Sequence, residues 1–499
     1  MIDSTPSRPA QSRPARSRPA RSLLTQSHPS IPRSRVLIIV QNLPVPLDRR
    51  VWLECQALRD QGYSVSVICP KGPGDPARQT IDGVHIYKYK PAPEASGALG
   101  FAVEFAYSWL RTAALSLRVG REHGFDVIQA CNPPDTYWLL AWLWKAKGVR
   151  FIFDHHDLNP ELFLSRFGQP RSAAAKFQYR TLLWLERMTF RVADHVISTN
   201  GSYRGVALRR GHLRPEQVTV VRSGPDTRVM RPIHPDADAA THTGPLLAYL
   251  GIMGPQDDVD KVLDVVDELV TRRGRTDLRA VIMGFGDCLE GLKAEAINRG
   301  LDRHVHFTGR VGPDVIANYL SAADIGVGPD QRTPLNDVST MNKTMEYMAF
   351  ALPSVSFDLA ETRISGGDAA IYVPTADIGA FADAIERLLD DPEERARLGR
   401  AARDRVATEL DWQHQAQQYI SVYDRVLENR PTISRLAAWP FSERMPSAVS
   451  PNERFVDLES GEEYAEFLLT RGRPNRQPNP SAPTAAAAAA ASAGQTVGG

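Results

Sequence analysis

The sequence predicts an α/β protein built from two doubly wound domains with parallel sheets, and three observations support this. Short apolar segments rich in β-branched residues alternate with amphipathic helical segments, a rhythm typical of a parallel sheet with helices on both faces. The rhythm stops near residue 228 and restarts near residue 243. The chain has 499 residues, which is long enough for two or three domains of about 150 residues.

The first domain is expected over residues 36–228. Residues 35–42 (RVLIIVQN) have the unbroken apolar character of a buried strand, and residues 49–62 follow with apolar residues at helical spacing. Further strands are predicted at 63–70, 126–132, 150–156 and 194–200.

The second domain is expected over residues 243–410, and a crossover helix at 411–429 follows it. Open α/β sheets bind ligands at the carboxyl ends of their strands, so two such Rossmann-like domains would face a central cleft that holds the site. The strands of this domain are predicted at 246–254, 278–286, 304–311, 323–330, 352–358 and 369–374.

Both ends of the chain lack the pattern of a folded domain. Residues 1–34 hold six Pro and a crude SRPA repeat, and residues 430–499 are rich in Pro and Ser and include seven consecutive Ala. We expect both segments to be largely disordered, apart from one short helix at 462–470.

The net charge of +1 conceals an uneven distribution. Residues 1–35 hold seven Arg and one Asp, which leaves 52 Lys or Arg against 57 Asp or Glu in the rest of the chain, a net charge of −5. A mildly acidic folded part argues against a nucleic-acid partner.

Cysteine usage and apolar runs favour a cytoplasmic protein. The four Cys show no pairing pattern, and the longest apolar run, 137–144, has eight residues, whereas a bilayer span needs about 20.

Segments 101–120 and 136–147 are rich in Trp, Phe and Leu and are expected mostly in the core. The alternative is a peripheral contact with the inner membrane surface, helped by nearby Lys and Arg.

Two segments of the second domain have the character of phosphate sites. Gly284 and Gly286 follow a predicted strand and precede a helix, so the backbone could approach a phosphate there, although an ordinary tight turn has the same pattern. In residues 339–358 a polar loop leads into a helix that carries Asn342, Lys343 and Glu346. A diphosphate at the helix start and a ribose at Glu346 would suit one nucleotide, and the alternative is a capped, solvent-facing helix.

The chain resembles the retaining glycosyltransferases of family 4, which have the GT-B fold. The resemblance covers about 36–428, roughly four fifths of the chain, and it is carried by GFGDCLEGLK, HVHFTGRV, AADIGVGP, NKTMEYMAFALPSV and DHHDLNPELF. It is strongest to a subgroup of bacterial cell-surface polysaccharide enzymes with MGPQD and DHHDLNPE. The resemblance implies a hexosyl- or N-acetylhexosaminyltransferase that uses a nucleotide-diphosphate sugar, without a metal or other cofactor. The implied acceptor is a glycan or a polyprenyl-diphosphate-linked acceptor.

The resemblance also implies roles for individual residues. Glu346 would bind the donor ribose, and the loop from Ser339 through Asn342 to Lys343 would face the diphosphate, with Lys343 stabilising the leaving group. His156 would lie beside the transferred sugar. The remaining expected positions are Gly284, Gly286, Arg310 and Val311 on the donor side, and Asn42, Asp48 and Arg49 on the acceptor side.

This sequence departs from the family pattern at two places. The usual E-x7-E pair would put an acid at position 338, where Val338 stands beside Asp337. The usual R-x4-K pair, which neutralises the diphosphate leaving group, is missing from IMGPQDDVD at 252–260. Lys343 is the nearest substitute, followed by Arg310 and Arg332.

Two motifs invite a metal interpretation. His155 and His156 are adjacent on a strand and point to opposite faces, so they cannot easily bind one ion. The D-x-D pattern at 258–260 is typical of the GT-A fold, which has a single nucleotide-binding domain, whereas this sequence predicts two. We therefore expect no metal site.

Two other functions stay open at this point. Nucleotide-sugar 2-epimerases share the two-domain fold, and a non-catalytic scaffold would explain the missing acid at 338.

Overall fold

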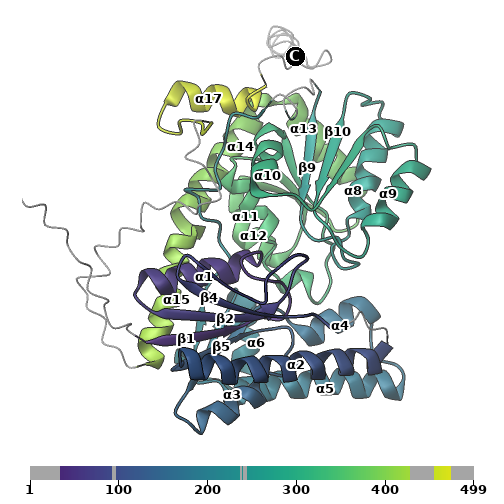
Figure 1. Ribbon diagram of the computed structural model, residues 1–499. Coiled ribbons are helices and arrows are strands. Elements are labelled where there is room, and N and C mark those ends of the chain that lie inside the picture. The colour runs from purple at the N-terminus through teal and green to yellow at the C-terminus, as the bar shows by residue number, and fades with distance from the viewer. Residues whose placement is uncertain (1–33, 93–96, 237–238, 240–243, 428–453, 474–499) are drawn as a thin grey trace, which may run out of the picture.

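The structure is a computed structural model that describes residues 34–92, 97–236, 239, 244–427 and 454–473. Two α/β domains lie one above the other, as Figure 1 shows, and each has the predicted parallel sheet between layers of helices. The chain therefore has the expected doubly wound fold with two Rossmann-like domains. The expectation for residues 1–33 lies outside the described residues.

The first domain contains an eight-stranded sheet in the order β3-β4-β2-β1-β5-β6-β7-β8. Its strands pair in parallel, except that β3 and β4 form an antiparallel hairpin that the sequence pattern did not predict. The strands are β1 (Arg35–Ile39), β2 (Ser64–Pro70), β3 (Arg78–Ile81), β4 (Val84–Tyr89), β5 (Val127–Cys131), β6 (Arg150–His155), β7 (His195–Ser198) and β8 (Val218–Val220).

Helices cover both faces of this sheet because alternate residues of each central strand are buried on opposite sides. Val36 and Ile38 pack against one helix layer, and Leu37 and Ile39 against the other. The first layer is α1 (Arg49–Asp60) with α15 (Trp412–Val426). The second is α2 (Gly97–Glu122), α3 (Trp138–Lys145), α5 (Ala173–Val192) and α6 (Gly201–Arg210), while α4 (Asn159–Phe167) follows β6.

The second domain contains a six-stranded parallel sheet in the order β11-β10-β9-β12-β13-β14. All six strands lie within the predicted segments: β9 (Leu246–Leu250), β10 (Arg279–Met283), β11 (Val305–Gly309), β12 (Ile325–Gly328), β13 (Ser354–Phe357) and β14 (Ala370–Val373). The helices are α8 (Asp260–Asp267), α9 (Leu289–Asn298), α10 (Pro313–Ala322), α11 (Asn342–Ala349), α12 (Ala360–Gly366), α13 (Ile378–Asp390) and α14 (Pro392–Arg405). Short helical turns lie at Pro215–Gln217, Glu268–Arg272, Asn336–Val338, Gly367–Ala369 and Val406–Leu410.

Helix α15 belongs to the first domain in space although it follows the second in sequence (Figure 1). Its buried face carries Trp412, Ala416, Tyr419 and Tyr423, which join the core beside α1. Burial of several large side chains, each worth roughly 1.5–3 kcal/mol, fixes this crossover and ties the two domains together at one edge.

The expectation of little structure after residue 430 needs a correction for residues 454–473. Helix α17 (Gly461–Thr470) forms where a short helix was expected and packs on α14. Beyond it, Arg471 donates to the carbonyl oxygens of Leu320, Ala323 and Ala351, at the ends of second-domain helices. A buried arginine with this many acceptors anchors the segment, which a composition argument could not foresee.

Candidate active site

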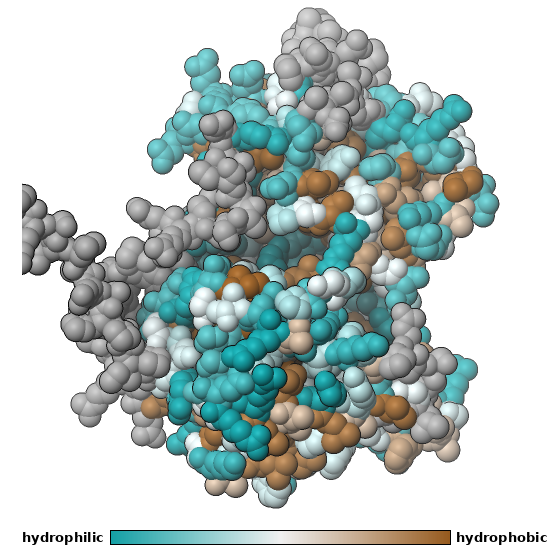
Figure 2. Space-filling model, in the orientation of Figure 1, coloured by the Kyte–Doolittle hydropathy of each residue, from teal (hydrophilic) through white to brown (hydrophobic). Residues whose placement is uncertain are grey.

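The carboxyl ends of the two sheets face each other, and Figure 2 shows the surface hollowed between the domains. Side chains meet across this cleft at several points. Asn200 donates to the Val338 carbonyl over 2.9 Å, and the Tyr203 hydroxyl lies 2.9 Å from the Ser339 hydroxyl. The loop expected to face the diphosphate therefore rests on the start of α6.

Glu346 lies on the second turn of α11 and points across the cleft. Its Oε1 lies 2.5 Å from Nη1 of Arg49, at the start of α1 in the other domain. Arg49 remains partly exposed, and the same Nη1 lies 3.3 Å from Sδ of Met230. The residue expected to bind the donor ribose and a residue expected on the acceptor side are thus brought together.

Lys343 is buried and paired inside the second domain. Its Nζ lies 2.7 and 2.8 Å from the two carboxylate oxygens of Asp330, and it sits 5.3 Å from the ring centre of Tyr249. Burial lowers the pKa of Lys343, but Asp330 and Asp257 outweigh this effect, so its pKa lies above the ordinary value. The ammonium group is therefore charged and already compensated by Asp330.

Acidic side chains occupy the region where the family pattern has its basic pair. Asp257 accepts from the Gly254 amide over 2.9 Å, and burial raises the pKa of Asp257 to about 6, although Lys343 opposes the shift. Asp258 accepts from the backbone amide of Gln331 over 2.8 Å. Asp260 instead pairs with Lys261, so the D-x-D carboxylates at 258 and 260 turn to different partners.

Gly284 and Gly286 are explained by close packing of backbone. Both have positive φ, at 146° and 152°, and a Cβ there would lie 1.8 Å from the Gly251 carbonyl oxygen and 2.6 Å from that of Met253. The two glycines therefore let the loops after β9 and β10 lie against each other. This packing accounts for the two glycines without a ligand, and the expected phosphate contact stays a prediction.

The remaining donor-side and acceptor-side positions have mixed surroundings. Arg310 is exposed and its guanidinium stacks 5.0 Å from the ring centre of Phe285, while Val311 packs half-buried against the second-domain core. Asn342 and Asn42 are exposed at loop ends. Asp48 accepts from the Val51 amide over 3.1 Å and so caps α1, a structural role that the expected acceptor-side role did not include.

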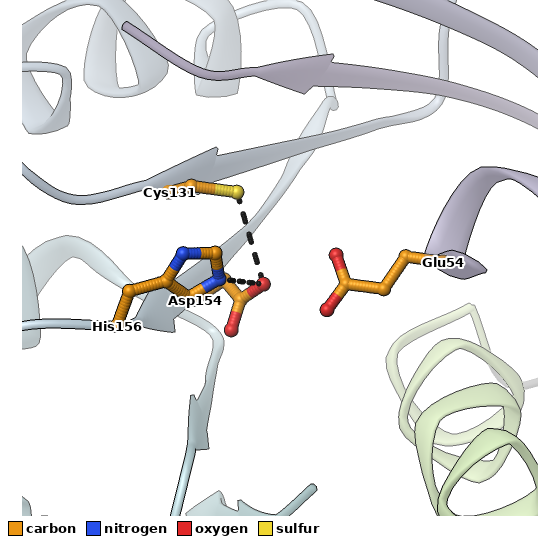
Figure 3. Close-up of side chains that lie close together, drawn as sticks. All are labelled: Glu54, Cys131, Asp154 and His156. Atoms are coloured by element: carbon orange, nitrogen blue, oxygen red, sulfur yellow. Dashed lines mark hydrogen bonds and ion pairs between the residues drawn. The ribbon is translucent and has the colours of Figure 1, made fainter. Parts of the chain in front are cut away.

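His156 is held by a charged cluster at the carboxyl end of β6. Its Nε2 lies 2.8 Å from Oδ2 of Asp154 and 3.0 Å from Nε of Arg50. Arg50 in turn lies 3.0 Å from Glu54 and 3.1 Å from Asp154. Figure 3 shows Glu54, Cys131, Asp154 and His156 converging from α1, β5 and the end of β6.

The cluster continues through a buried glutamine to the crossover helix. Nε2 of Gln129 donates to Glu54 and to Asp154 over 2.8 Å each. Oε1 of Gln129 accepts from the hydroxyls of Tyr419, over 2.7 Å, and Tyr423. Helix α15 therefore helps to fix the geometry around His156.

The two acids of this cluster have opposite shifts. Burial raises the pKa of Glu54 well above its usual range. Burial also acts to raise the pKa of Asp154, but Arg50 and His156 outweigh it and hold that pKa below its usual range. The arrangement is a neutral Glu54 beside an ionised Asp154, whose charge Arg50 balances.

The cluster has donor atoms that could hold a metal ion, but its charges do not favour one. Ligand atoms of Glu54, Cys131, Asp154 and His156 lie within 4.8 Å of one another. The guanidinium of Arg50 already contacts three of these four residues and supplies the positive charge. Burial also raises the pKa of the Cys131 thiol well above its usual range, which opposes the thiolate that a metal requires.

The two adjacent histidines are separated as expected. His155 is buried on the other side of the strand among the rings of Phe153, Phe190 and Tyr203, while His156 reaches the cleft side. Sequence reasoning named His156 but missed Asp154 and Arg50. The available signal was the spacing of Asp154 and His156, two residues apart on a strand and therefore on the same face.

Two facing doubly wound domains with a polar site in the cleft between them are the arrangement of the GT-B fold. The chain belongs to the family whose models are described as "Glycosyl transferases group 1", matched over residues 244–391, and "Glycosyl transferase 4-like domain", matched over residues 47–224.

Known proteins resemble the chain in sequence and in fold. Alpha-D-kanosaminyltransferase of Streptomyces kanamyceticus is 28% identical over 62% of this chain and 79% of its own length. Glycogen synthase of Mycobacterium tuberculosis is 28% identical over 76% of this chain and 90% of its own length.

Solved structures share the fold at low identity. Sucrose-phosphate synthase from Thermosynechococcus elongatus superposes with a TM-score of 0.62 at 20% identity, covering 79% of this chain and 100% of that one. The Anabaena protein HepE, in complex with UDP-glucose, has a TM-score of 0.59 at 14% identity with the same coverage, 79% and 100%.

Proposed function

We propose that the protein is a retaining glycosyltransferase that moves a hexosyl or N-acetylhexosaminyl group from a nucleotide-diphosphate sugar. The acceptor in this proposal is a glycan or a polyprenyl-diphosphate-linked sugar, in the synthesis of cell-surface polysaccharide or glycolipid. The ion pair between Glu346 and Arg49 carries the proposal. It joins the acid proposed to bind the donor ribose to the loop proposed to lie beside the acceptor.

The reaction breaks the bond between the anomeric carbon and the diphosphate oxygen, and the acceptor oxygen bonds to the same carbon from the same face. The acceptor proton passes to the departing diphosphate. The proposed state in between has oxocarbenium-like character, and His156 hydrogen-bonds the sugar. Its ring is preorganised for this by Asp154 and Arg50.

Arg49 is our candidate for the charge that the missing basic pair would have supplied. Lys343 is tied to Asp330, whereas Arg49 is partly exposed in the cleft beside the proposed ribose site. When the ribose hydroxyls bind Glu346, the Arg49 guanidinium is released to pair with the diphosphate. Stabilisation of developing charge by a positioned cation is among the largest contributions to catalysis, and in this proposal no metal takes part.

The protein is proposed to act in the cytoplasm, in contact with the inner surface of the membrane where a polyprenyl-linked acceptor would lie. Within the described residues, no helix is both long enough and apolar enough to cross a membrane. The contact in this proposal is peripheral.

The first experiment identifies the donor. Thermal melting is measured with UDP-, GDP-, ADP- and dTDP-sugars, since a ligand at 100 times its Kd adds about 2.7 kcal/mol to the stability of the folded state. NMR of the donor incubated alone then follows its fate. Slow hydrolysis with retained anomeric configuration supports the proposal, and a new epimer of the nucleotide sugar supports an epimerase instead.

A pair of variants tests the site. Glu346→Ala should remove the donor-induced rise in melting temperature, while Glu290→Ala, at an exposed position on α9, should leave it unchanged. Full donor binding and turnover in Glu346→Ala would exclude the proposed site. Donor binding by the wild type without turnover on any lipid-linked acceptor would favour a scaffold.

A further inference from the structure

Helix α2 exposes a continuous apolar stripe on the outside of the first domain. Val103, Leu110 and Leu117 lie seven residues apart, and their exposed fractions are 63%, 62% and 47%. Ala106 and Ala114 are exposed between them. Residues at this spacing share one face of a helix, so the outward face of α2 is apolar along most of its length.

The neighbouring helices extend this apolar surface. Trp142 on α3 is 59% exposed, and Phe177 and Trp184 on α5 are 74% and 52% exposed. The three helices are in contact: Trp144 of α3 donates to Ser116 of α2 over 3.1 Å, and the rings of Trp138 and Trp184 lie 5.8 Å apart.

Figures 1 and 2 show where this surface lies. Helices α2, α3 and α5 lie along the side of the first domain that faces away from the second domain. Hydrophobic residues gather along that edge of the molecule. We call it the α2–α3–α5 face; its exposed apolar members are Val103, Leu110, Leu117, Leu139, Trp142, Leu143, Phe177 and Trp184.

The same three helices concentrate positive charge. Together they carry eight Lys or Arg and three Glu, although the chain after residue 35 is acidic overall. Of these groups, Glu186 pairs with Arg210, Arg118 pairs with Glu122 and Lys145 pairs with Asp194, so the remaining Lys and Arg still outnumber the remaining Glu. Arg180 and Arg187 on α5 are exposed one turn from Trp184.

We propose that the α2–α3–α5 face docks on the surface of an anionic lipid bilayer. Tryptophan, leucine and phenylalanine would enter the interface between headgroups and acyl chains while Lys and Arg pair with the headgroups. A second copy of this chain is a poorer occupant because two basic faces repel each other, whereas an anionic bilayer complements both the apolar and the basic parts.

The face adjoins the mouth of the cleft through α4. Phe167, at the end of α4, is exposed, and the residue before it, Arg166, donates to Gln256 of the second domain over 3.1 Å. Ser165 donates to Thr333 of the same domain over 3.3 Å. Helix α4 therefore lies between the α2–α3–α5 face and the cleft. This inference deepens the proposed function and rests on it only for its purpose, namely access to a lipid-linked acceptor.

The test uses the full chain and co-sedimentation with vesicles. Vesicles of pure phosphatidylcholine are compared with vesicles that also contain phosphatidylglycerol. The wild type should bind the anionic vesicles, and high salt should weaken binding. Two variants test the face. The first is the triple variant Trp142→Ser, Leu143→Ser, Trp184→Ser, and the second is the double variant Arg180→Glu, Arg187→Glu. The affinity of each variant for the anionic vesicles should fall at least about tenfold.

Matched controls separate this surface from other causes. Ile297→Ser with Ile364→Ser removes exposed apolar residues from the second domain and should leave binding unchanged. All variants keep the Arg-rich residues 1–35, so unchanged binding in the face variants, lost on deletion of residues 1–33, would overturn the proposal. A wild type that binds neither kind of vesicle would overturn the proposal as well.

The two proposals can fail separately. Donor hydrolysis in solution does not involve the α2–α3–α5 face, so the face variants should keep the wild-type rate of donor hydrolysis. Vesicle binding without sugar transfer would support docking and refute the proposed transferase activity. Sugar transfer without vesicle binding would support the transferase activity and refute docking.

Discussion

Arg49 in the first domain and Glu346 in the second form an ion pair of 2.5 Å that spans the cleft. Each side chain comes from the first two turns of a helix at the carboxyl edge of its sheet, α1 and α11. The pair is the point where the two halves of the site meet. In the proposed reaction the donor ribose replaces Arg49 on Glu346 and frees the guanidinium for the diphosphate.

Replacing Arg49 should therefore damage catalysis more than donor binding. Arg49→Ala removes the cation that compensates the leaving group, and loss of one such group typically costs a factor of about 100–1,000 in kcat. Arg49→Lys should recover part of this loss. The measurement is kcat and KM for donor hydrolysis. Arg59→Ala on the same helix, whose partner is the neighbouring Asp60, is the control. An unchanged kcat in Arg49→Ala would refute this role.

Asp154 should act on the reaction through His156. Asp154→Asn keeps the size of the side chain but cannot hold the charge that pairs with Arg50 and His156. We expect kcat to fall about 100-fold or more while donor KM changes little, because the ring of His156 loses the contacts that orient it. The comparison is Asp126→Asn, which breaks a surface pair with Arg35 and should leave kcat as it is.

A structural role alone would give a different pattern for Asp154. The pKa of Asp154 is held below its usual range, so its stabilising contribution is present above the unfolded pKa, about 3.9, and is lost only as pH falls through the lower folded value. Wild-type and Asp154→Asn activities should therefore differ by a constant factor across the neutral range. A variant that loses only melting temperature would argue against positioning.

Asp257 should make donor binding depend on pH. Burial raises its pKa to about 6, so the carboxyl is neutral below that pH and negatively charged above it. A negative charge beside the proposed diphosphate site repels the donor, and affinity should fall as pH rises through about 6. Asp257→Asn should abolish this dependence and bind more tightly above it. Calorimetry with a nucleotide sugar suits the test because the diphosphate diester of the donor does not titrate near pH 6. A wild-type affinity that does not change with pH would contradict this prediction.

Much of the fold could be predicted because it depends on local patterns. Most second-domain strands are short apolar runs, and the core strands of the first domain, such as 35–42, have the same character. The sequence does not predict the hairpin of β3 and β4 because RQTI has a single apolar residue and VHIYKY is interrupted by His and Lys. Strand β3 can be polar because it lies at the edge of the sheet, where half of its residues are exposed.

The sequence predicts candidate site residues but not their pairings. Glu346, Lys343 and His156 are candidates from the sequence, whereas their pairing with Arg49, Asp330 and Asp154 is set by tertiary contacts. The sequence predicts that Lys343 neutralises the diphosphate. Lys343 is buried against Asp330, and for this reason we propose Arg49 for that task. A charged side chain in sequence does not reveal whether its charge is already compensated.

Arg473 should be among the most important residues for stability, although it lies outside both sheets. Its Nη2 lies 2.6 Å from Oδ2 of Asp324, and both side chains are almost fully buried. Arg473→Ala would remove one partner of a buried ion pair, which typically costs 3–5 kcal/mol. Because the pair links residues after α17 to the start of β12, the variant should also release α17 from α14. Urea unfolding, with Arg397→Ala at an exposed i,i+3 pair as control, measures the loss. Adding Asp324→Asn should restore part of the lost stability, because the buried negative charge is then removed as well. No recovery in the double variant would show that the packing of the arginine, rather than its charge, holds this segment.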